Sequence, residues 1–240
     1  SIVRVINQQA DPYDCQKNLV FSRLPDQTAI RVSNYIIIIL GLRGRSKASQ
    51  NKDTITIYDW LENERHKGCN EITSVIGLFD TLRNAKFEDE DFDCVRLCSD
   101  GCPGQNKNST VIAVVMKWFK EEAPDTVKKV EFVFSIIGHS FLPPEGYWEI
   151  EKVIRKEGTI ETPDKYMTIF KEFGTVKRLG SEVPIHDWKS AVHEVIKPTG
   201  QWHFKLSLCK RIILTKDIGE ILVCEVKCTT IAIVEFQVQY

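Results

Sequence analysis

The sequence lacks several features that would assign it to a class of protein at once. Its longest strongly aliphatic stretch, Tyr35 to Leu42, is far shorter than the roughly 18 residues that cross a bilayer, so we expect no membrane contact. Ser1 to Ile6 lack the charged start, apolar middle and cleavage site of a secretory signal. The chain does not begin with Met, so we expect an excised or processed piece of a longer protein.

A strong excess of charge is also absent. The formal net charge is -1, which weakens any nucleic-acid hypothesis without excluding it. Eight cysteines are dispersed through 240 residues, a length that needs no disulfide staples, so we expect free thiols in a reducing compartment. Cys94, Cys98 and Cys102 recur every four residues, but zinc ligands usually come as close pairs. Buried thiols are therefore favoured over a zinc site there.

Apolar residues follow the period of a strand in some segments and that of a helix in others. The predicted strands are 13–21, 33–42, 54–60, 94–99, 130–137, 202–215, 220–226 and 229–238. The predicted helices are 70–83, 110–122, 147–156, 163–174 and 187–197. Asn108 or Ser109 is expected to cap the second helix, which should be largely buried, and Ile55, Ile57 and Asp59 should share one face of their strand.

The first eight of these elements have the order of an RNase H-like core: three strands, then helix, strand, helix, strand and helix. We therefore predict an α/β fold with a mixed five-stranded sheet flanked by helices over residues 1–200. Residues 201–240 are predicted to form a C-terminal β extension packed on this core. No internal repeat or low-complexity linker interrupts the chain.

Acidic residues from distant segments meet in such a core, because two divalent cations held by shared carboxylates can process a phosphodiester. Mg²⁺ prefers carboxylate oxygens and keeps several waters, so a few side chains suffice. The candidates are Asp14 in the first strand, Glu71 in the first helical turn, Asp100 where the fourth strand ends, and Glu145, Glu149 or Glu151 near the last core helix. His139 is a further candidate, as a general acid or as a group that positions metal-bound water.

Each candidate also has a structural interpretation. Asp14 can cap its own backbone, Glu71 can favour the positive end of a helix dipole, and His139 can bond to backbone groups. The other histidines are expected to be structural, and Trp118 and Trp148 are expected in the core. The basic segment 43–52, with Arg43, Arg45, Lys47 and Lys52, is either a nucleic-acid contact or a solvated hairpin loop.

Asp100 stands out because of its surroundings, Cys98-Ser-Asp-Gly-Cys-Pro-Gly-Gln-Asn-Lys-Asn108. A turn explains the aspartate and glycines, but it explains the following amide and lysine side chains less well. Gln105, Asn106, Lys107 and Asn108, together with a helix N-terminus, are candidates to hold a phosphate backbone.

This segment resembles the signature of a transposon-derived domain of animal proteins, in which a strand ends in Ser-Asp, followed by Cys, Gly-Gln-Asn-Lys-Asn and a helix. Segments 13–21, 58–71, 138–143 and 202–214 resemble other parts of that family in the same order. The resemblance implies a DDE-transposase or integrase-like RNase H fold, with Mg²⁺ or Mn²⁺ as a two-ion cofactor. Asp14, Asp100 and Glu145 or Glu151 would be the metal ligands, and Glu71 and His139 would assist. It also implies DNA rather than RNA as the partner and a nuclear location; a homo-oligomer is left open.

Two departures from the family pattern bear on activity. After Gly-His-Ser the chain reads Glu145-Gly-Tyr-Trp-Glu-Ile-Glu151, which omits an expected arginine and leaves the last acidic ligand ambiguous. The second strand is almost wholly aliphatic where the family carries polar residues. Two functions therefore stay open: a divalent-metal-dependent nuclease or polynucleotidyl transferase, and a catalytically inactive domesticated domain that binds nucleic acid or protein. A thiol enzyme using Cys102 with His139 is a weaker third alternative.

Overall fold

The computed structural model describes a defined set of residues. These are 9–15, 19–20, 33–40, 55–61, 69–85, 93–100, 103, 106–135, 150, 152–154, 156–157, 160, 162–202, 204–216, 222–228 and 233–237. Within them the fold is mixed α/β, as the sequence predicted. None of the helices in these ranges is long and apolar enough to cross a membrane.

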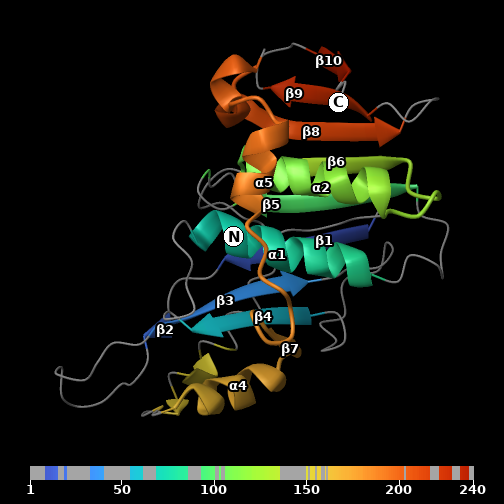
Figure 1. The fold of residues 1–240 in the computed structure, drawn as a ribbon. Coiled ribbons are helices and arrows are strands. Elements are labelled where there is room, and N and C mark those ends of the chain that lie inside the picture. Colours follow the sequence, from blue (N-terminus) through green and yellow to red (C-terminus); the bar gives the residue numbers. More distant parts are fainter. Residues whose placement is uncertain are drawn as a thin grey trace.

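The described strands form one sheet of ten strands (Figure 1). They are β1 (Gln9–Cys15), β2 (Leu19–Val20), β3 (Ser33–Leu40), β4 (Ile55–Leu61), β5 (Cys94–Asp100), β6 (Lys129–Ser135), β7 (Thr175–Arg178), β8 (Cys209–Lys216), β9 (Leu222–Cys228) and β10 (Ile233–Gln237). Their order is β10-β9-β8-β6-β5-β1-β3-β4-β7, and β2 pairs with β3 off this path. The pairs β1–β5, β5–β6 and β4–β7 are parallel, and the others are antiparallel.

One face of the sheet is covered by α1 (Cys69–Asn84), α2 (Ser109–Glu121) and α5 (Trp188–Val195), which lie in front of it in Figure 1. Val95, Leu97, Phe132 and Phe134 pack there, and Trp118 is 1% exposed, so its predicted place in the core is confirmed. The predicted cap of α2 is also confirmed, because the side chain of Asn108 accepts a hydrogen bond from the backbone of Val111.

The opposite face carries a second core below β4. Ile55 and Ile57 pack there with Ile150 and Ile154, which belong to a helical segment, and with residues of α4 (Pro163–Lys171). Asp59 is fully buried two residues after Ile57, so Ile55, Ile57 and Asp59 share one face as predicted. Val95 and Leu97 point to the helices. Because successive residues of a strand point to opposite faces, the even-numbered positions of β5 belong to the same face as this second core.

The predicted first strand, 13–21, is wrong in its bounds. β1 begins at Gln9 and ends at Cys15, and β2 covers only Leu19 and Val20. Pro12 lies inside β1, which is flanked by β5 and β3 in the middle of the sheet. Since proline lacks a backbone donor and is usually confined to edge strands, the Asp-Pro pair argued against a strand there.

The predicted strand 202–215 is wrong in its first half. Short 3-10 helices, η3 (Thr199–Gln201) and η4 (Leu206–Leu208), precede β8. The Trp202 indole donates to the carbonyl of Lys197 at 2.7 Å, which holds the chain in a turn at this point. The strands after it pair edge to edge with the core, β8 on β6, so they widen the sheet instead of packing on its face.

Candidate functional site

Asp14 and Asp100 lie near the carboxyl ends of β1 and β5, which are adjacent parallel strands in the centre of the sheet. β1 and β5 are parallel with a constant offset of 86 residues, from Gln9 opposite Val95 (95 − 9) to Pro12 opposite Cys98 (98 − 12). The paired register ends there, and the same offset continued by two residues relates Asp14 to Asp100. Positions that are level on adjacent parallel strands belong to one face, so the register assigns both aspartates to the face opposite α1 and α2.

Of the remaining predicted catalytic residues, the structure describes only the backbone position of Glu71. Glu71 lies in the first turn of α1. His139, Glu145 and Glu151 lie outside the described residues, as do the predicted nucleic-acid contacts Arg43, Arg45 and Gln105. The roles predicted for these residues stay predictions.

The loop before α2 makes contacts within the protein. Lys107 is 8% exposed; its ammonium donates to the Ser207 carbonyl at 2.8 Å and lies 5.1 Å from the centre of the Phe134 ring. Asn108 accepts from the backbone of Val111 at 2.9 Å and donates to the carbonyl of Pro103 at 3.3 Å. Asn106 is 1% exposed. These contacts hold the loop against the turn before β8, and phosphate binding by these residues stays a prediction.

A cluster that the sequence did not predict lies on the same face as the two aspartates. Glu131 of β6 is 1% exposed; its carboxylate accepts a hydrogen bond from Arg96 Nε at 2.6 Å and forms an ion pair with Arg211 Nε at 3.0 Å. Burial disfavours a charged guanidinium, but the hydrogen bond and the charge of Glu131 outweigh it and raise the pKa of Arg96 above its usual range. A single glutamate in the apolar run Lys-Val-Glu-Phe-Val-Phe-Ser was the available signal.

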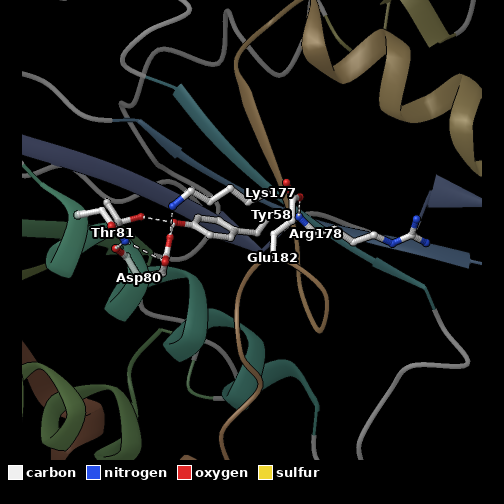
Figure 2. Close-up of polar contacts among 7 residues, drawn as sticks. Tyr58, Asp80, Thr81, Lys177, Arg178 and Glu182 are labelled. Carbon is white, nitrogen blue, oxygen red and sulfur yellow. Dashed lines mark hydrogen bonds and ion pairs between the residues drawn. The ribbon is translucent and has the colours of Figure 1, made fainter.

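A second polar cluster lies on the helix-covered face (Figure 2). Tyr58 of β4 is fully buried, and its hydroxyl donates to Asp80 Oδ2 at 2.7 Å and contacts Thr81 Oγ1 at 2.8 Å. Lys177 of β7 reaches the same Asp80 oxygen at 2.5 Å, and Asn84 donates to the other oxygen at 2.9 Å. The cluster ties the edge strand β7 to α1 through β4, so its geometry indicates a structural role.

The described part of the chain contains no group of three or more histidine, cysteine or acidic residues arranged to hold a metal ion. Glu145 and Glu151 lie outside this part. No protein-family model, curated protein or solved structure matches the chain. The position of Asp14 beside Asp100 is therefore the main support for a site.

Proposed function

We propose that this chain is a metal-dependent nucleic-acid-processing domain with an RNase H-like core, which cleaves or transfers a phosphodiester at Asp14 and Asp100. The observation that supports the proposal is the parallel pairing of β1 with β5, near whose carboxyl ends Asp14 and Asp100 lie. Ligand and catalytic residues commonly gather at such ends in α/β sheets.

The strand order supports the same fold. The core strands run β4-β3-β1-β5-β6, with β3 antiparallel to both neighbours and β1, β5 and β6 parallel. α1 connects β4 to β5 and α2 connects β5 to β6, and both lie on one face. This is the arrangement that the order of predicted elements implies for an RNase H-like sheet.

The donor set fits a hard divalent cation, because aspartate and glutamate oxygens are the ligands that Mg²⁺ and Mn²⁺ prefer. Asp14 and Asp100 would hold the metal together with Glu145 or Glu151. When bound, a pair of such ions supplies an activated oxygen nucleophile and stabilises the leaving oxygen. His139 would orient water and carry protons at the same site. Glu71 belongs to α1, which covers the other face of the sheet, so its role at the aspartates stays a prediction.

Metal-dependent thermal stability tests this proposal. Millimolar Mn²⁺ or Mg²⁺ should raise the melting temperature of the full chain, because a ligand bound only by the folded state stabilises it. Asp100→Asn should abolish the rise. Asp93→Asn is the matched control, since Asp93 is exposed just before the other end of β5 and should leave the rise intact. The absence of a rise with both metals would refute a cation site.

A catalytically inactive binding module is the second candidate. It is favoured by the two departures from the family pattern, the arginine omitted after Gly-His-Ser and the aliphatic second strand. Incubation of the metal-loaded chain with labelled duplex DNA separates the candidates. Cleavage that Asp100→Asn removes supports the enzyme, whereas DNA binding without cleavage supports the module.

A further inference from the structure

The Arg96–Glu131–Arg211 triad spans three adjacent strands, β5, β6 and β8. Both oxygens of the Glu131 carboxylate are used, Oε2 by Arg96 and Oε1 by Arg211. Two guanidinium groups share one carboxylate, so the triad carries a net positive charge. This charge is a feature that an anion can complement.

The negative and positive parts of the triad differ in their access to solvent. The side chain of Glu131 is 1% exposed, whereas those of Arg96 and Arg211 are 25% and 45% exposed. The buried carboxylate holds the Nε atom of each guanidinium. The terminal nitrogens of each guanidinium therefore have a defined orientation. A guanidinium held in place loses little entropy on binding, and its planar fork matches the geometry of a phosphate.

The position of Arg211 relates it to the two aspartates. Arg211 is paired with Val133, and Val133 is paired with Cys98, so Arg211 is level with the position two residues before Asp100. Residues two apart on a strand share a face. Arg211 therefore lies two strands away from Asp100, about 10 Å across the sheet and about 7 Å along it.

The neighbouring strand adds a second basic position. Lys227 of β9 is paired in register with Arg211. Glu225 is paired with Ile213, two residues further from Asp100, so the basic pair is nearer to the aspartates than this acid.

We propose that Arg211, oriented by Glu131, binds a backbone phosphate of DNA on the face that carries Asp14 and Asp100. The inference rests on the proposed function and adds to it a surface that binds DNA beyond the aspartates. DNA engaged at the aspartates continues over β6, β8 and β9, so strands β8 and β9 contribute to substrate binding as well as to the width of the sheet.

Salt-dependent binding of fluorescently labelled duplex DNA to the full chain, in EDTA, tests the inference independently of metal. Arg211→Gln should weaken binding about fivefold and lower the slope of log K against log salt by about 0.9, the value for one lost phosphate contact. Arg211→Lys keeps the charge and loses the fork, so the slope should stay while affinity falls. Lys189→Gln is the charge-matched control, because Lys189 lies in α5 on the opposite face and should not change binding.

Urea unfolding of each variant shows whether it is folded, since Arg211→Gln leaves Glu131 paired with Arg96. An unchanged slope in folded Arg211→Gln, or an equal loss in Lys189→Gln, overturns the inference. The proposed catalysis can be refuted independently of the proposed phosphate contact. If Asp100→Asn changes neither metal binding nor cleavage while Arg211→Gln still weakens DNA binding, the phosphate contact stands and the metal site does not.

Discussion

Lys107 and Ser207 are joined across 100 residues of sequence by a hydrogen bond of 2.8 Å from the lysine ammonium to the serine carbonyl. The bond fastens the loop before α2 to the 3-10 turn before β8. It connects the Asp100 end of β5 to the strands that widen the sheet. Lys107 belongs to the Gly-Gln-Asn-Lys-Asn segment, for which phosphate binding is predicted. The contact gives Lys107 a second role, which is to stabilise the fold.

Lys107→Met should therefore lower the free energy of unfolding. A hydrogen bond from a charged donor contributes about 1.5–3 kcal/mol, and a methionine retains most of the apolar stem. Lys128→Met is the control, because the side chain of Lys128 is exposed, and its unfolding free energy should stay near that of the unmodified chain. Urea denaturation measures both. Equal values for the two variants would show that the bond to Ser207 adds nothing to stability.

Gly174 should not tolerate a side chain. It follows α4 and precedes β7, and a Cβ placed on it would lie 2.6 Å from the Ile55 carbonyl and 2.8 Å from Ile55 Cγ2. Gly174→Ala should cost about 1–3 kcal/mol of unfolding free energy, because β7 must move away from β4 to make room.

Gly200→Ala provides the matched comparison for Gly174→Ala. A Cβ on Gly200 meets no atom within 4 Å. This substitution should be neutral or stabilise by up to about 1 kcal/mol, since alanine restricts the unfolded chain. Chemical denaturation of both variants tests the contact between Gly174 and Ile55, and similar results for the two would mean that β7 is not seated against β4.

The pairing of β7 with β4 also shows where sequence reasoning reaches its limit. Thr175–Arg178 has four residues, too few for a periodic signal, and it becomes a strand by parallel pairing with Thr56 to Asp59. By contrast, α2 was predicted closely, because its apolar positions and the Asn108 cap are local features. Local patterns therefore predict elements that are stable by their own composition, and they miss those that depend on a distant partner.

The same distinction applies to the candidate site. The order of elements and the resemblance together selected Asp14 and Asp100 as candidates, and β1 and β5 are adjacent parallel strands that end at the same edge of the sheet. The triad at Glu131 was not predictable. Its partner Arg211 is set by the antiparallel register of β8 on β6, which no local pattern in 209–216 specifies.

High pH should destabilise the fold through Cys94. Burial raises the pKa of the Cys94 thiol above its ordinary value of 9.0. Above that pH the unfolded chain loses the thiol proton while the folded chain keeps it, so the unfolded state binds fewer protons. Stability from this group is therefore complete below pH 9.0 and is lost as pH rises through the folded-state pKa.

Cys94→Ala should accordingly show a shallower loss of unfolding free energy than the unmodified chain when pH is raised from neutral to about 10. Denaturant unfolding across this range gives the two slopes. The comparison of slopes cancels the constant cost of the smaller side chain and the contributions of the other titrating groups. Identical slopes would show that the Cys94 thiol ionises alike in both states.

Tyr58 and Lys177 should be energetically coupled through Asp80, since both bind Asp80 Oδ2, at 2.7 and 2.5 Å. Tyr58→Phe removes a hydrogen bond to a charged acceptor and should cost about 1.5–3 kcal/mol. Lys177→Met removes the ion pair at a site where the lysine side chain is 29% exposed, and it should cost less.

The double variant tests the coupling. Once Tyr58 no longer donates, Asp80 depends more on Lys177, so the combined loss should differ from the sum of the single losses by about 0.5 kcal/mol or more. Lys171→Met, at an exposed position in α4, should add to Tyr58→Phe without coupling. Additivity for Lys177→Met as well would mean that the two side chains act on Asp80 independently, and that the cluster does not link β7 to α1 as one unit.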